Sequence, residues 1–230
     1  MRIAGLALGL SAVVLTAQSA VDPGAATAPR MEFVAPAAGS YQLQRIQPVR
    51  DAILLTASGT PTHLAGVTSR KITLLTFFYT YCADPLGCPF AYTTLTGLRD
   101  RVLGEPGLAG RVRFVSVSFD PTTDTPQAIG WYGQHVSADP RFEWQFLTAR
   151  SVSELMPVLD DFGQDVSVET DAAGHPTRTR HHMLKLFLID ASGEVREIYT
   201  LAFLQPQVMF NDIKTLAMET ERATTLGDQP

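Results

Sequence analysis

The chain contains only two cysteines, Cys82 and Cys88, with five residues between them. Two thiols this close can form a disulfide, act as a redox pair, or bind a metal ion as thiolates. A purely structural disulfide more often joins distant segments, because its stabilisation grows with the length of the closed loop. The spacing also differs from the C-x-x-C of common redox motifs. We therefore favour redox or metal chemistry and keep the structural disulfide as the alternative.

Two adjacent histidines, His181 and His182, stand directly before an apolar segment at residues 183–189. Two thiolates and one imidazole would make a small, soft site, in which thiolates select Cu(I) and imidazole accepts either copper state. Zinc is the competing metal, although zinc sites usually have four protein ligands. The alternative for the histidine pair is a solvated loop with nothing bound.

The cysteines need elements that position them, and residues 71–103 supply these. Residues 72–79 are apolar or β-favouring at nearly every position, as in a buried strand. A polar loop with both cysteines follows, and then a helical pattern from Pro89 to Leu103. Proline is favoured at the first helical position, so we expect Cys88 at the N-cap, where the helix dipole favours its thiolate.

The rest of the chain alternates strands and helices. We expect strands at residues 112–119, 142–148, 183–189 and 194–200, and a strand or hairpin arm at 46–55, with residues 163–180 irregular. We expect helices from Pro126, capped by Thr125, to about His135, from Ser151 in a capping box with Glu154, and from Pro206 to near Arg222. Pro157 should kink the second of these helices or shift its start.

This order predicts an α/β, thioredoxin-like fold, with a mixed central sheet, helices on both faces and an extra N-terminal hairpin. In that arrangement residues 183–189 run antiparallel to residues 72–79 and next to them. The two histidines would then begin their strand beside the cysteine loop, and one of them could reach both sulfurs.

The composition is that of an ordinary globular protein, with 45% hydrophobic and 18% charged residues. The net charge is −5 and no basic run is present, which argues against a nucleic-acid partner.

The N-terminus has the pattern of an export signal. Arg2 precedes an apolar run at residues 3–15, and residues 17–19 offer a small-x-small cleavage site. The run is short for a membrane span, so we expect cleavage and a periplasmic protein, with an uncleaved anchor as the alternative. The predicted segments are a signal peptide at 1–20, a linker at 21–45, one domain at 46–222 and a tail at 223–230.

Three segments in this order resemble the Sco/SenC family of copper-delivery proteins: FFYTYCADPLGCP at 77–89, SVSFDPTTDTPQ at 116–127 and HHMLKLFLIDASGEV at 181–195. The resemblance implies a metallochaperone with a thioredoxin-like fold and copper held by Cys82, Cys88 and His182. It also implies delivery to a cuproenzyme such as the copper centre of cytochrome c oxidase. The implied partners are an oxidase subunit and a thiol reductant protein. One feature departs from the family, whose cysteines are usually three residues apart.

Three other functions compete. A thiol–disulfide oxidoreductase would use Cys82 or Cys88 to attack a partner and the other to resolve, and would not need His182. A thiol peroxidase lacks its Thr-x-x-Cys arrangement here, because positions 79 and 85 are Tyr and Pro. The third is an interaction module without metal.

The remaining polar candidates are expected to be structural or solvated. We expect turn and cap roles for Asp120 and Asp124, which the resemblance places near the metal loop, and a core position for Met183. The residues expected at the solvated surface are Asp84, His63, His135 and His175.

Overall fold

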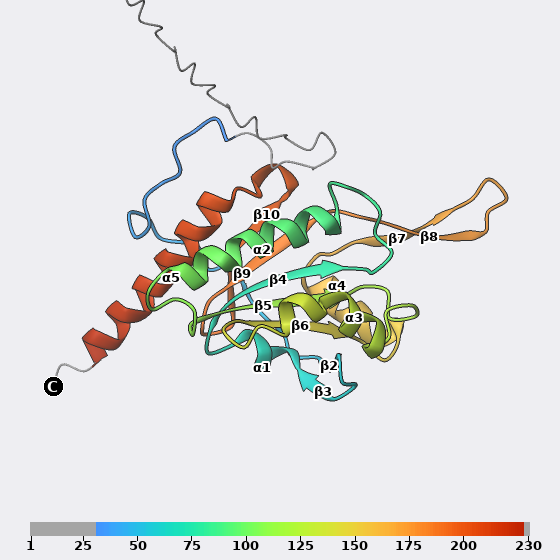
Figure 1. Ribbon diagram of the computed structural model, residues 1–230, viewed down its shortest axis with the longest axis horizontal. Coiled ribbons are helices and arrows are strands. Elements are labelled where there is room, and N and C mark those ends of the chain that lie inside the picture. The colour runs from blue at the N-terminus through green and yellow to red at the C-terminus, as the bar shows by residue number, and fades with distance from the viewer. Residues whose placement is uncertain (1–30, 228–230) are drawn as a thin grey trace, which may run out of the picture.

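The computed structural model describes residues 31–227, so the predicted signal peptide lies outside the described residues (Figure 1). Eight strands form one sheet in the order β1 (Gln47–Pro48), β10 (Glu194–Thr200), β9 (Lys185–Ile189), β4 (Ile72–Phe78), β5 (Val112–Ser118), β6 (Glu143–Thr148), β2 (Ile53–Thr56) and β3 (Pro61–His63). The helices are α1 (Leu64–Thr68), α2 (Cys88–Gly104), α3 (Pro126–Ser137), α4 (Val152–Asp161), α5 (Pro206–Gly227) and the short 3-10 helix η1 (Leu201–Phe203).

The centre of the sheet consists of the strands that the sequence marks as apolar. β4, β5 and β6 are parallel, and β9 is antiparallel to β4. Every residue of β4 and β5 is buried, which explains their continuous apolar runs. The predicted mixed sheet, with these strands as neighbours, is confirmed.

Helices cover both faces because successive side chains of β4 point in opposite directions. The ring of Phe78 stacks on Tyr132 of α3 at 4.9 Å, whereas Phe77 contacts Phe162, directly after α4, at 5.5 Å. On the face of the sheet that α3 covers, α2 also contacts α5. There the Arg101 side chain donates to the Pro206 carbonyl at 3.1 Å. The prediction of helices on both faces is confirmed.

The segment at residues 46–55 does not form one hairpin arm as predicted. β1 pairs with β10 at one end of the sheet, whereas β2 pairs with β3 and β6 at the other. Pro48 has no N–H for a ladder and ends β1 after two residues. The predicted extra hairpin exists as β2–β3.

Residues 163–180 were expected to be irregular, and that expectation was wrong. β7 (Val166–Thr170) and β8 (Pro176–His182) form an antiparallel hairpin that projects from the body (Figure 1). Its turn is held by Asp171, which accepts the His175 N–H at 2.9 Å. Most of its residues are polar and exposed or half-buried, so the apolar alternation typical of a strand is missing.

The helix starts follow the predicted caps. Thr125 accepts the Ala128 N–H at 3.3 Å, and Ser151 accepts the Glu154 N–H at 3.2 Å. Pro157 lies inside α4 and does not shift its start. α5 continues past its expected end to Gly227.

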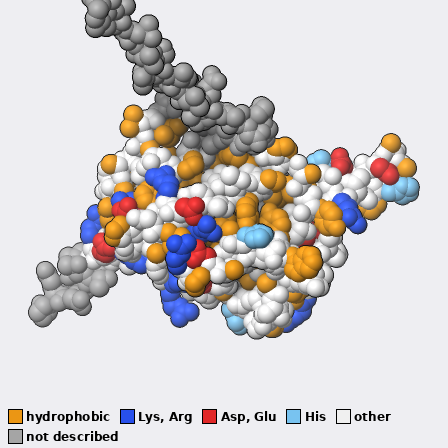
Figure 2. Space-filling view, in the orientation of Figure 1, with side chains coloured by type: hydrophobic (Ala, Val, Ile, Leu, Met, Phe, Trp, Pro, Cys, Tyr) orange, Lys and Arg blue, Asp and Glu red, His pale blue; other side chains and the backbone are white. Residues whose placement is uncertain are grey.

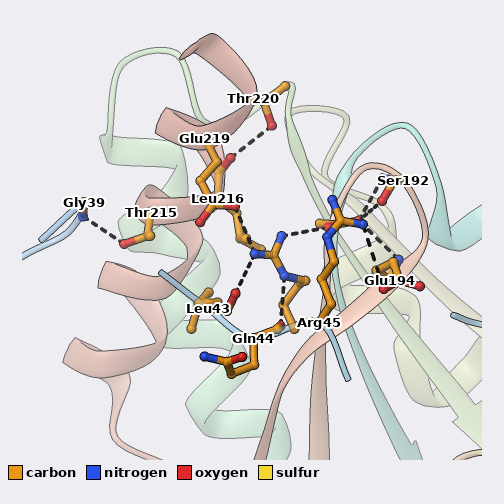
Figure 3. Close-up of polar contacts among 12 residues, drawn as sticks. Gly39, Leu43, Gln44, Arg45, Ser192, Glu194, Thr215, Leu216, Glu219 and Thr220 are labelled. Atoms are coloured by element: carbon orange, nitrogen blue, oxygen red, sulfur yellow. Dashed lines mark hydrogen bonds and ion pairs between the residues drawn. The ribbon is translucent and has the colours of Figure 1, made fainter. Parts of the chain in front are cut away.

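The described part of the predicted linker, residues 31–45, contains no helix or strand, but hydrogen bonds attach it to the domain. The Gly39 N–H donates to Thr215 of α5 at 2.9 Å, and the Leu43 carbonyl accepts from Arg196 at 2.7 Å (Figure 3). The boundaries of the four predicted segments stay predictions. Within residues 31–227, no helix combines the length and the hydropathy that a membrane span requires.

Candidate metal centre

Cys82, Cys88 and His182 lie together at one end of the central sheet. One ligand atom from each residue lies within 4.8 Å of the other two. Cys82 belongs to the loop after β4, Cys88 begins α2, and His182 ends β8. The three side chains therefore meet from three separate elements.

The register of the sheet explains this convergence. β4 pairs antiparallel with β9 so that Thr76 faces Leu186, and the residues before β9 lie beside the loop that follows β4. The predicted juxtaposition of His182 with the cysteine loop is confirmed. The role of the three residues as metal ligands stays a prediction.

The predicted N-cap position of Cys88 was wrong by one residue. Gly87 is the N-cap, and Cys88 is the first helical residue, buried with 2% of its surface exposed. The Cys88 N–H therefore points at the half-buried Cys82, whose sulfur accepts it at 3.4 Å. A side chain at position 87 would bring its Cβ to 3.0 Å from the same sulfur, so this turn favours glycine.

The two thiols differ in acidity, and the expectation that the helix start favours a Cys88 thiolate was wrong. Hydrogen bonding by the Cys88 side chain, helped by His182 and by the Cys88 N–H, outweighs burial and lowers the pKa of Cys82 to about 4. The same hydrogen bond, together with burial, raises the pKa of Cys88. The thiolate of the pair is therefore on Cys82, and the buried Cys88 is its donor.

The imidazole of His182 is held between two aromatic rings. Its centroid lies 4.6 Å from the ring of Phe119 and 6.1 Å, edge to face, from that of Tyr79. The Tyr79 hydroxyl in turn accepts the backbone N–H of Arg180 at 3.3 Å, two residues before His182. These contacts restrict the orientation of the imidazole.

Arg180 was not singled out by the sequence, yet it supports the site. Its guanidinium donates to the carboxylate of Asp120 at 3.0 Å, and both side chains are largely buried. The Thr and Arg alternation in residues 176–182 could have indicated a strand with residues 180 and 182 on the same face.

The second aspartate of the DPTTDTP segment supports the cysteine loop. Asp124 is fully buried and accepts the Thr80 N–H at 3.1 Å and the Ser118 hydroxyl at 2.5 Å. Burial raises the pKa of its carboxyl, and the hydrogen bonds oppose that shift. Asp120 and Asp124 are therefore more than turn residues, since they join the end of β4 and the hairpin to the loop after β5.

The remaining candidates lie outside the cluster. Met183 is 59% exposed, so the expected core position was wrong: it lies between β8 and β9, where its side chain faces solvent. The residues found at the surface as expected are Asp84, His63, His135 and His175. Among these, His63 has a partner that the pattern did not reveal, Asp51 at 2.6 Å.

The donor set fits a soft metal ion. Both cysteines are free, and the cluster offers two sulfurs and one ring nitrogen from half-buried or buried positions. Thiolates favour Cu(I) and zinc over hard ions. Three protein ligands also leave room for another donor at the ion.

Solved structures share this fold at low sequence identity. Arabidopsis thaliana ScoI with copper bound matches at a TM-score of 0.61 and 19% identity, over 74% of this chain and 98% of that chain. Bradyrhizobium japonicum ScoI with copper bound matches at 0.58 and 23%, over 73% and 98%. BsSco, a member of the Sco family of cytochrome c oxidase assembly proteins in which a disulfide switch was identified, matches at 0.58 and 22%, over 77% and 98%. The likeness confirms the thioredoxin-like fold.

No curated protein matches this chain in sequence. The SCO1/SenC family model, by contrast, matches residues 54–218, from β2 to the middle of α5. This match covers well over half of the chain and includes the cysteine loop, the DPTTDTP segment and His182. The chain therefore belongs to the SCO1/SenC family.

Proposed function

We propose that this chain binds one copper ion through Cys82, Cys88 and His182 and delivers it to a cuproenzyme, such as the copper centre of cytochrome c oxidase. The observation that carries the proposal is the convergence of the three ligand atoms within 4.8 Å of one another. The copper-bound Sco structures of the same fold support copper as the metal. The export signal that the sequence predicts at residues 1–20 supports action in the periplasm.

The geometry supports binding by the longer loop. Five residues separate the cysteines, yet the loop closes on itself, because the Gly87 N–H donates to the Asp84 carbonyl at 2.9 Å. The ordered turn keeps the two sulfurs together without a disulfide. Ligands must be deprotonated to bind a metal, and Cys82 is already a thiolate at neutral pH. Only the proton of Cys88 remains to be displaced.

Delivery would proceed by ligand exchange and not by bond-making catalysis. The half-buried Cys82 and His182 lie on the solvent side of the site, and the buried Cys88 lies beneath them. A recipient's ligands could therefore replace Cys82 and His182 before the last bond to Cys88 is broken.

Anaerobic copper titration of the reduced protein tests the proposal, with free thiols counted before and after. We expect one Cu(I) per chain, both thiols protected from alkylation, and proton release on binding. Binding of copper with both thiols still open to alkylation would contradict the three-ligand site.

A thiol–disulfide oxidoreductase is the second candidate, favoured by the lowered pKa of the Cys82 thiol beside the buried thiol of Cys88 and by the disulfide switch in BsSco. The Cys82 thiolate would attack a partner disulfide and release one partner thiolate, forming a mixed disulfide. Cys88 would then lose its proton and attack Cys82, which releases the second partner thiolate. The partner gains two electrons, the chain is oxidised, and a thiol reductant protein must restore it. This function would not need His182.

A further inference from the structure

A groove of about 1050 Å³ opens beside the candidate metal centre. It lies between the cysteine loop, α4 and the β7–β8 hairpin, and both Gly87 and His182 belong to its wall. A molecule seated in this groove would therefore touch His182, one of the three proposed ligands, and the turn at Gly87 beside the cysteines.

The wall of the groove exposes several large hydrophobic residues from different segments. These residues are Leu86, Val152, Met156, Val168 and Met183, and their exposed fractions lie between 45% and 59%. Figure 2 shows hydrophobic side chains on the surface at the base of the projecting hairpin. Exposed apolar side chains gathered around one groove are typical of an interaction site. The two methionines can adapt their shape to an apolar partner.

The groove also carries negative charge. Asp84, Asp160 and Asp165 belong to its wall, and within residues 31–227 none of the three forms an ion pair. The one arginine of the wall, Arg180, is paired with Asp120. The groove therefore combines an apolar surface with three carboxylates that form no ion pair within the described residues.

We infer that this groove docks a partner protein that presents apolar side chains flanked by Lys or Arg, and that this partner receives the copper. The inference rests on the proposed function, because the groove is continuous with the metal centre. A second copy of this chain fits poorly, since its net charge is −5 and it would bring like charge to the carboxylates. Anionic lipid headgroups would be repelled for the same reason.

The test is a binding titration with a defined probe, the purified copper-receiving domain of the source organism's cytochrome c oxidase. Met156→Asp and Val168→Asp place a charge on the apolar wall, and each should weaken binding of the probe about tenfold or more. Ile53→Asp is the matched control, because Ile53 on β2 is 45% exposed, as Met156 is, but lies outside the groove. We expect its affinity to stay within about twofold of the parent.

The role of the carboxylates is tested by measuring how binding of the probe depends on salt concentration. Raising NaCl from about 0.05 to 0.5 M should weaken binding of the parent, because screening removes the attraction between the groove and a basic partner. The Asp160→Asn/Asp165→Asn variant should bind more weakly at low salt and depend less on salt.

Copper titration of every variant separates this inference from the proposed function. If the groove variants bind both copper and the probe like the parent, docking in the groove is wrong and copper binding stands. A parent that binds no copper contradicts the proposed function. A parent that binds copper but not the probe contradicts the oxidase as recipient and this inference with it. If sedimentation shows a dimer that Met156→Asp dissociates, a second copy occupies the groove and the inference is overturned.

Discussion

The carboxylate of Asp120 and the guanidinium of Arg180 form an ion pair of 3.0 Å, with side chains only 5% and 14% exposed. The pair joins the loop after β5 to β8, two residues before His182. The same arginine donates its backbone N–H to the hydroxyl of Tyr79, the residue directly after β4. β8, the strand that carries His182, is therefore bound both to the loop after β5 and to the residue that follows β4.

Removal of Arg180 should destabilise this assembly. Arg180→Met leaves the buried Asp120 charge uncompensated, and we expect a loss of about 3 kcal/mol in the free energy of unfolding, measured by urea denaturation. Arg178→Met on the same strand is the control, because Arg178 is exposed and lies over the ring of Tyr81. Addition of Asp120→Asn to Arg180→Met should recover part of the loss. Strictly additive losses would mean that the two side chains are not coupled.

The thiolate of Cys82 should show in the pH dependence of the reduced protein. The folded-state pKa lies at about 4, below the ordinary value of 9.0. Between pH 9.0 and about pH 4, Cys82 therefore binds more protons in the unfolded chain than in the folded chain. The contribution of Cys82 to stability is therefore lost as the pH falls from 9.0 toward about 4.

The rate of alkylation measures the ionisation of the Cys82 thiol directly. At about pH 6, iodoacetamide should modify Cys82 and spare the buried Cys88, because the thiolate is the nucleophile. Cys88→Ala removes the main hydrogen bond to Cys82, and alkylation of Cys82 at this pH should slow. Equal modification of both cysteines in the parent would contradict the assignment.

The parts of the fold that the sequence revealed are those dominated by burial. β4, β5 and β9 are apolar because the sheet buries them, so their sequences alone identify them. The β7–β8 hairpin was missed because its solvated residues give no apolar alternation. The split of residues 46–55 was missed because local sequence does not reveal which edge of a sheet a short strand joins.

The site was predictable where topology alone brings residues together. The antiparallel pairing of β4 and β9 places His182 beside the cysteines. The support from Arg180 depends on contacts across 60 and 101 residues of chain, which local patterns do not show. The acidity of the thiols was misassigned because the hydrogen bond between the two sulfurs and the burial of Cys88, which local patterns do not show, favour the thiolate on Cys82.

Two helical glycines should respond to alanine in opposite directions. A Cβ at Gly133 of α3 would clash with the ring of Phe146, so Gly133→Ala should lower the free energy of unfolding by about 1–3 kcal/mol. A Cβ at Gly97 of α2 meets nothing within 4 Å, and Gly97→Ala should stabilise the helix by about 0.5–1 kcal/mol. Thermal unfolding measures both. A neutral Gly133→Ala would show that α3 can move away from β6.

The last prediction separates the two candidate functions through the histidine pair. His182 lies with the sulfurs and packs between aromatic rings, whereas its neighbour His181 is exposed and lies outside the cluster of ligand atoms. His182→Ala should weaken Cu(I) binding about tenfold or more, because one of three ligands is lost. His181→Ala is the matched control and should bind copper like the parent.

Disulfide formation should proceed in both histidine variants, because the sulfurs of Cys82 and Cys88 remain beside each other. Copper affinity measured by competition with a chelator, and thiol counts after mild oxidation, give the two readouts on the same samples. If His182→Ala binds copper like the parent and still forms the disulfide, the three-ligand site is wrong. The chemistry of the cluster would then reside in the two sulfurs alone, and the oxidoreductase would become the leading function.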